Sequence, residues 1–271
     1  MPQREVAKHA TVLFLIGSVV FVSACSRLSF IRPSYDRGRY EQVAHEVHID
    51  PRSNGRDTAF TMVQVAQSRL LGGDAQAAAT AAERALKADA SSADAHSLLA
   101  LSLDALGRYA EAGAHHRRAA ELAPARGALL NNYGIWLCSN GKAAESLDWF
   151  TRAVAAPGYE TPDAALANEA ACAAQIGQGP RAEAAARRAL AIAPSNALAL
   201  TVLARTALAG GRGLEARAFI ERRLAAAPAD PDALQLASQI EKSLGDTAAA
   251  ARYVERLRTE FPPTSRPSGD K

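Results

Sequence analysis

The stretch that decides the fold is residues 131–177, NNYGIWLCSNGKAAESLDWFTRAVAAPGYETPDAALANEAACAAQIG. It contains one complete predicted helical hairpin and the first half of the next. Its glycines Gly141 and Gly177 belong to a series whose successive members lie 34, 34, 36, 34 and 34 residues apart. The series is Gly73, Gly107, Gly141, Gly177, Gly211 and Gly245. A turn residue that recurs at a nearly fixed interval predicts a chain built from one repeated supersecondary unit.

A period of 34 residues is that of the tetratricopeptide repeat, in which helix A, a turn and helix B form one unit. In the second unit we expect helix A over residues 94–106, a turn at Gly107 and Arg108, and helix B from Tyr109 to just before Pro124. The sequence therefore predicts an all-α, right-handed tetratricopeptide-repeat solenoid of six helix-turn-helix units. The units are 59–92, 93–126, 127–162, 163–196, 197–230 and 231–264.

Two further features recur with the repeat. Proline closes helix B because it cannot continue the hydrogen-bond ladder, and these stops are Pro124, Pro194, Pro228 and Pro262. A small side chain is expected where helix A approaches helix B, at Ala78, Ala112, Ser146, Ala182, Ala216 and Ala250. A second small position, Ala85 in the first unit, is Arg223 in the fifth and Leu257 in the sixth. A register shift that uses Leu224 is one explanation of Arg223.

The composition excludes several functional classes. Hydrophobic residues make up 48% of the 271 residues, so the chain can bury a substantial core and is not disordered as a whole. Basic residues number 31 against 28 acidic ones, and both signs are scattered along the helices. No basic cluster alternates with aromatic residues, and we therefore expect no nucleic-acid binding.

Candidate catalytic or metal-binding residues are few. The sequence has no glycine-rich phosphate loop, no nucleophile motif and no paired metal-ligand spacing. His45 and His48 have no third ligand nearby, and we interpret them as a solvated helix face. His115 and His116 lie among arginines on a predicted B helix, where we also expect them to be solvated. The sequence predicts a protein that is not an enzyme and that binds no metal or other cofactor.

The N-terminal residues have the pattern of a signal peptide. Arg4 and Lys8 precede an apolar run from Ala10 to Val22, which is shorter than the roughly 20 residues that a membrane-spanning helix needs. The sequence that follows, Ser23-Ala24-Cys25, resembles the end of a bacterial lipobox, in which the cysteine is lipidated and becomes the new N-terminus. The alternative is an ordinary secretory signal with a chance cysteine.

A lipid on Cys25 would tether the folded part to a membrane. Ser26 follows Cys25, and by resemblance to the sorting rule of Gram-negative lipoproteins this favours the outer membrane. We expect the chain to be anchored at its periplasmic face. The predicted organisation is a signal peptide over 1–24, the lipidated cysteine and a spacer over 25–57, the six repeats over 58–264 and a disordered tail over 265–271.

The two remaining cysteines, Cys138 and Cys172, are 34 residues apart and lie late in neighbouring A helices. Stacked A helices lie about 8–10 Å apart, which brings two such thiols near bonding range. In an oxidising compartment we expect a disulfide. The alternative is that both are small buried hydrophobic residues.

The A helices of such a stack present a concave surface that binds peptides in many repeat proteins. Asn132 and Asn168 occupy equivalent places, where their amides are suited either to a ligand backbone or to capping and interhelical hydrogen bonds. We expect no nucleic acid as partner and a monomeric chain. The predicted groove residues are Phe60, Val63, Gln67, Leu70, Ser97, Leu101, Asp104, Asn131, Asn132, Ile135, Cys138 and Asn168.

Residues 131–172 resemble the type IV pilus assembly lipoproteins of the PilF or PilW type, the pilotin family. The family pattern departs only mildly here, with Ser146 in place of alanine and Ala170 in place of glycine, and Cys25 matches the lipid anchor. The matching residues are Asn131, Asn132, Tyr133, Gly134, Trp136, Leu137, Cys138, Gly141, Glu145, Phe150, Ala153, Pro157, Tyr159, Pro162, Ala165, Asn168 and Cys172.

This resemblance implies an accessory protein of pilus biogenesis and twitching motility. Such a protein binds subunits of the outer-membrane secretin of the type IV pilus and helps them to reach that membrane or to assemble in it. The competing hypothesis is a tetratricopeptide scaffold lipoprotein of another envelope machine, such as a Tad-type pilus, a secretion system or an adaptor for peptidoglycan enzymes.

Overall fold

The computed structural model describes residues 54–262. The predicted signal peptide, Cys25, His45 and His48, and the tail 265–271 lie outside the described residues. No helix within the described range has the length and apolar character needed to cross a membrane. The helices are α2 (Gly55–Leu71), α3 (Ala75–Ala88), α4 (Ala93–Ala105), α5 (Tyr109–Leu122), α6 (Gly127–Ser139), α7 (Ala143–Ala155), α8 (Pro162–Gln175), α9 (Gly179–Ile192), α10 (Ala197–Ala209), α11 (Gly213–Ala226), α12 (Pro231–Ser243) and α13 (Thr247–Glu260).

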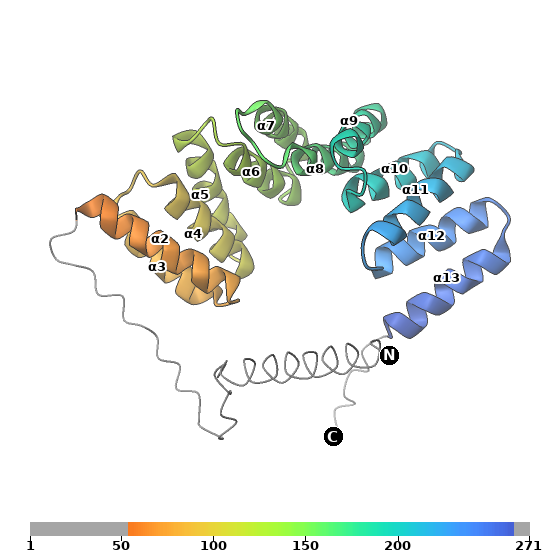
Figure 1. Cartoon of the computed structure of the whole chain (residues 1–271), viewed down its shortest axis with the longest axis horizontal. Coiled ribbons are helices and arrows are strands. Elements are labelled where there is room, and N and C mark those ends of the chain that lie inside the picture. Colours follow the sequence, from red (N-terminus) through yellow and green to blue (C-terminus); the bar gives the residue numbers. More distant parts are fainter. Residues whose placement is uncertain (1–53, 263–271) are drawn as a thin grey trace, which may run out of the picture. The chain divides into compact units, whose positions relative to one another are not determined.

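Consecutive helices pack in pairs, from α2 with α3 to α12 with α13, and each pair packs against the next (Figure 1). The even-numbered helices are the A helices of the repeats and the odd-numbered helices are the B helices. This confirms the predicted all-α array of six helix-turn-helix units. The two helices of the second unit, α4 and α5, begin and end within a residue of their predicted bounds.

The A-to-B turn is the same in every unit. Gly141 has φ of 80°, a left-handed conformation that costs glycine no steric strain. The backbone N–H of Lys142 then donates to the carbonyl of Leu137 at 2.8 Å, which satisfies an acceptor at the end of α6. The other five glycines of the series have φ between 71° and 80°. The interval between glycines therefore marks the end of each A helix.

Side-chain caps fix where several helices begin. Asn54 precedes α2, and its Oδ1 accepts from the backbone N–H of Asp57 at 3.0 Å. This cap places the start of α2 at Gly55, before the boundary expected at residue 58. The same kind of cap is made by Asp74, Ser92, Asn196, Asp230 and Asp246.

The predicted small positions of the B helices lie in the core. Each of the six, from Ala78 to Ala250, is at most 1% exposed. Ser146 is the polar member of the series, and its hydroxyl donates to the carbonyl of Ala143 at 2.7 Å. Because that hydrogen bond stays within α7, the serine is accommodated without a partner from a neighbouring helix.

Arg223 occupies the second small position of α11 without a shift of register. The residue is 7% exposed, while Leu224 is half-buried. The guanidinium donates to the carbonyls of Ala227 at 3.2 Å and Pro228 at 2.8 Å, and it pairs with the carboxylate of Asp230. A buried arginine is stable here because the link to α12 turns its acceptors toward it.

The last helix, α13, is covered on one side only. Its buried residues are Ala249 and Ala250, and Arg252, Glu255 and Arg256 on its outer face are exposed, as is Arg258. The charged side chains on this outer face keep the last helix in contact with solvent.

Candidate partner-binding groove

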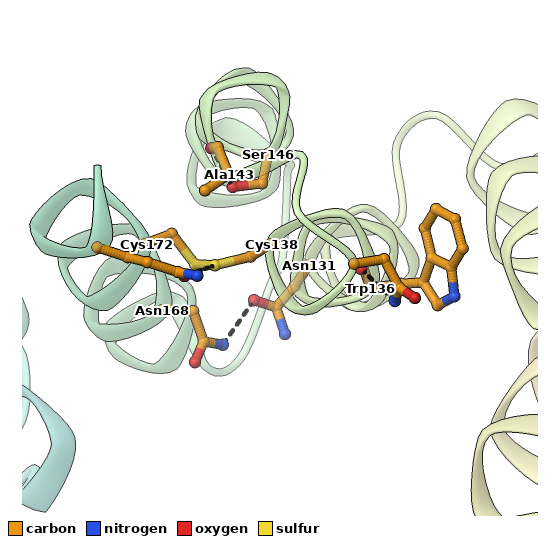
Figure 2. Close-up of a disulfide and its surroundings, with 9 residues drawn as sticks. Asn131, Trp136, Cys138, Ala143, Ser146, Asn168 and Cys172 are labelled. Atoms are coloured by element: carbon orange, nitrogen blue, oxygen red, sulfur yellow. Dashed lines mark hydrogen bonds between the residues drawn. A yellow bond between two sulfur atoms is a disulfide. The ribbon is translucent and has the colours of Figure 1, made fainter. Parts of the chain in front are cut away.

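A disulfide joins the A helices of the third and fourth repeats. Cys138 on α6 and Cys172 on α8 are bonded, with their Cα atoms 5.9 Å apart (Figure 2). The two helices are separated in sequence by α7 but lie next to each other in the array. The structure therefore has the disulfide predicted from the spacing, and this pair is structural rather than part of an open groove.

The predicted amide contacts of the same helices are interhelical. Nδ2 of Asn168 donates to Oδ1 of Asn131 at 3.0 Å (Figure 2). Of the two interpretations of Asn168, this is the interhelical hydrogen bond rather than an unoccupied ligand contact. Asn132, the next residue along α6, is half-buried and lines a cavity.

The tryptophan of the resemblance packs across to the preceding repeat. Trp136 on α6 lies over Gly113 of α5, where an added Cβ would come 2.2 Å from the indole ring. Its indole N–H donates to the carbonyl of Tyr109 at 3.0 Å. Gly134, on the same helix, similarly leaves room for the ring of Phe150, which a Cβ would approach to 2.7 Å. Two residues of the family resemblance thus pack closely on α6: Trp136 against the preceding repeat, and Gly134 against Phe150 of its own repeat.

Three of the predicted groove residues lie inside the array. Val63, Ser97 and Asn131 occupy the same position in their A helices and are 8%, 7% and 8% exposed, respectively. That position faces the neighbouring helices. These residues contribute packing, and a ligand would reach them only if the helices moved apart.

Four other predicted residues meet around one cavity. Leu101 and Asp104 of α4, with Asn132 and Ile135 of α6, line a space of about 260 Å³. Leu101 and Ile135 occupy equivalent repeat positions, and Ile135 is 39% exposed. Five further residues line the cavity and were not predicted from the sequence: Tyr109, His116, Trp136, Ser139 and Asn140.

His116 forms part of this cavity, and the prediction that it is solvated is wrong. The side chain is 3% exposed, and its Nε2 donates to Oδ2 of Asp104 at 2.7 Å. Burial lowers the pKa of His116, and the hydrogen bond to Asp104 only partly offsets that effect. His115 is half-buried, with its Nδ1 2.9 Å from Nδ1 of His96. The sequence did not show the burial of these two histidines, because their partners, Asp104 and His96, lie on another helix, α4.

The predicted residues on α2 lie elsewhere on the A-helix face. Phe60 is 66% exposed, Gln67 is exposed and Leu70 is half-buried. None of the three lines the cavity formed by α4 and α6. Gln67 occupies the same repeat position as Leu101 and Ile135, so the face is continuous in register across the first three repeats.

A second, larger cavity lies in the second half of the array and was not predicted. It has a volume of about 940 Å³ and is formed mainly by α8, α10 and α12. Small residues such as Ala171 and Ala174 leave it open, and Leu198 and Arg205 line it as well. Ala171 and Arg205 are the repeat equivalents of Ile135. The repeat register, extended beyond the third unit, would have located this cavity.

The larger cavity has room for a stretch of polypeptide, and the smaller one has room for a side chain. Their linings combine aliphatic or aromatic side chains with a few polar groups, as binding sites for peptides and small molecules commonly do. Within residues 54–262, no three histidine, cysteine, aspartate or glutamate side chains are grouped so that they could hold a metal ion.

Comparisons with known proteins agree with this geometry. A family model described as tetratricopeptide repeat matches residues 66–127. The crystal structure of PilW, a widely conserved type IV pilus biogenesis factor, is 32% identical in sequence, with a TM-score of 0.71 over 76% of this chain and 95% of that chain. A comparison with curated proteins finds no match.

Two more distant structures share the fold. PilF of Pseudomonas aeruginosa is 22% identical, with a TM-score of 0.69 over 78% of this chain and 96% of that chain. YrrB, a tetratricopeptide-repeat protein with an unusual peptide-binding site, is 20% identical, with a TM-score of 0.53 over 65% of this chain and 90% of that chain. At these identities the likeness indicates a common architecture.

Proposed function

Because the chain belongs to the family of PilW, a type IV pilus biogenesis factor, we propose that it is an outer-membrane lipoprotein that binds the secretin subunit of the type IV pilus. The observation that carries this proposal is the 32% identity to PilW. The packing supports it, because several residues of the family resemblance make contacts around α6: Cys138 is bonded to Cys172, Trp136 lies over Gly113, and Phe150 lies against Gly134.

In the proposed mechanism, acyl chains on Cys25 hold the protein at the periplasmic face of the outer membrane. The chain acts as a monomer, and the A-helix surface of its first three repeats binds a segment of the secretin. This binding helps the secretin to reach the outer membrane or to assemble in it. The chain acts by binding rather than by catalysis. The tetratricopeptide architecture supports this role, because stacked hairpins provide an extended surface for a polypeptide.

Replacement of the anchor tests the membrane part of the proposal. Cys25→Ser, with the rest of the signal peptide intact, should release the protein from the membrane fraction and leave secretin multimers misplaced or reduced in the outer membrane. The control is the amount of variant protein in the periplasm, which must match the unaltered protein. Secretin multimers that are normal in amount and location would count against the proposal.

Point variants test the binding surface. Removal of whole repeats is a poorer test, because it would expose the core of the next unit. Ile135→Asp and Phe60→Ser alter exposed side chains on the proposed surface, and both should reduce the recovery of purified secretin subunit in a pull-down. Leu214→Asp is the matched control, because Leu214 is 71% exposed on a B helix. Equal recovery with all three variants would place the secretin contact elsewhere.

A further inference from the structure

The cavity formed by α4 and α6 contains a carboxylate that is only half satisfied. Oδ2 of Asp104 accepts from His116. Oδ1 is buried and has no hydrogen-bond partner within residues 54–262. The Asp104 side chain as a whole is 30% exposed. A buried carboxylate oxygen without a donor loses its solvation without compensation, so a cationic group at the exposed part of the Asp104 side chain would offset this cost.

The charge of Asp104 is also unbalanced. Its only salt-bridge partner in the described part of the chain is His116, and burial disfavours the charged form of that histidine. No arginine or lysine among the described residues comes within ion-pair distance of Asp104. The larger cavity differs in this respect, because Asp230 pairs with Arg223 there.

The walls around Asp104 are apolar and aromatic. Leu101 and Ile135 provide aliphatic surface, and Trp136 and Tyr109 provide rings, of which Tyr109 is 55% exposed. A volume of about 260 Å³ is of the size of one long side chain. Lysine and arginine have apolar stems and a cationic end, and aromatic faces attract such cations.

We propose that this cavity is a pocket for one lysine or arginine side chain of the bound polypeptide, with the methylene stem against Ile135 and Trp136 and the cationic group at Asp104. The inference rests on the proposed function only in taking the secretin as the source of that side chain. It assigns the smaller cavity a specific role, the selection of a basic residue within an otherwise apolar contact.

Small amides test the pocket independently of any partner protein. The probes are N-acetyl-arginine amide and N-acetyl-lysine amide, with N-acetyl-glutamine amide as the neutral control. The chain has two tryptophans, so two indole N–H signals are expected in an NMR spectrum, and Trp149→Phe assigns that of Trp136. The cationic amides should shift the Trp136 signal, and the neutral amide should not.

Asp104→Asn is the decisive variant, because asparagine has the shape of aspartate and keeps an oxygen that accepts from His116, but it lacks the negative charge. This variant should weaken binding of the cationic amides by about tenfold or more, because one charge-assisted hydrogen bond is lost. Asp148→Asn, on the exposed face of α7, is the matched control and should bind as before. Thermal melting of both variants verifies the fold. Equal shifts with all three amides, or unchanged binding by Asp104→Asn, would overturn the pocket.

Peptides that tile the secretin subunit separate this inference from the proposed function. A bound peptide should contain a lysine or arginine whose replacement by glutamine weakens binding to the unaltered protein but not to Asp104→Asn. If the small cationic amides bind and no secretin peptide does, the pocket stands and the secretin is the wrong partner. If a secretin peptide binds and no basic residue matters, the proposed function stands and the pocket inference is wrong.

Discussion

Nδ2 of Asn168 on α8 donates to Oδ1 of Asn131 on α6 at 3.0 Å, and one turn further along α8 Cys172 is bonded to Cys138 of the same partner helix. The two A helices are thus tied by a covalent bond and by an amide hydrogen bond on one face (Figure 2). Since α7 lies between them in sequence, these ties fix how the third and fourth repeats pack. The smaller cavity, lined by α4 and α6, lies on the N-terminal side of this pair of linked helices.

Removal of the disulfide should destabilise the array. The bond closes a loop with a sequence separation of 34 residues, for which the chain-entropy model gives about 3–4 kcal/mol of unfolding free energy. The double variant Cys138→Ala, Cys172→Ala, compared with the oxidised chain in denaturant titrations, measures this loss. Cys25→Ala in both proteins removes the third thiol. Two free thiols in the unreduced, denatured parent would contradict the bond itself.

Two adjacent asparagines of α6 should behave differently. Asn131→Ala leaves the amide of Asn168 without its acceptor and removes a side chain that is only 8% exposed, so we expect a loss of about 1–3 kcal/mol of unfolding free energy. Asn132→Ala removes a half-buried side chain at the cavity and should change stability by less than about 0.5 kcal/mol. Denaturant titrations compare the two, and equal losses would show that Asn131 has no special structural role.

Gly113 should tolerate no side chain. A Cβ there would come 2.2 Å from the Trp136 ring, and Trp136 is held by its hydrogen bond to Tyr109. Gly113→Ala should therefore cost about 1–3 kcal/mol of unfolding free energy and lower the melting temperature. Gly179→Ala is the matched control, because the nearest atom to a Cβ at Gly179 is 4.0 Å away. A Gly113 variant as stable as the control would mean that Trp136 can move aside at little cost.

The architecture was predictable because its signals are local. One signal is the regular spacing of the six glycines from Gly73 to Gly245, and the other is the proline that stops helix B. Both depend on residues within one turn of a helix end. The disulfide could also be predicted, since both cysteines lie late in A helices and stacking places adjacent A helices side by side. The cap at Asn54 was also local, but its signal was weak because the spacer before it has no period.

The details of the candidate site were less predictable because they depend on contacts between helices. His116 looks solvated in sequence, among arginines on α5, but it is buried against Asp104 of α4. Arg223 breaks the small-residue pattern of the sequence, and its hydrogen-bond acceptors come from the link that follows the helix. The groove prediction identified the four cavity residues of α4 and α6 but also included Val63, whose register turns it inward.

The histidines of the second repeat give the fold a defined dependence on pH. Burial is the largest cause that lowers the pKa of His96, His115 and His116 in the folded chain. The unfolded chain keeps histidine near its ordinary pKa of about 6.5. Between the folded and the unfolded values, the unfolded chain therefore binds more protons than the folded chain, and protonation favours unfolding.

The stabilising effect of these neutral histidines is complete above a pH of about 6.5 and is lost as the pH falls from there toward their folded pKa values. We therefore expect a lower melting temperature near pH 5 than near pH 7.5, and a weaker dependence in His116→Gln, whose amide can still donate to Asp104. The carboxylate of Glu111, with a pKa lowered by its hydrogen bond from Arg108, loses its contribution only at lower pH. Melting curves across this range are the measurement. If His116→Gln has the same slope as the parent, the pH dependence comes from other groups, because the substituted side chain no longer titrates.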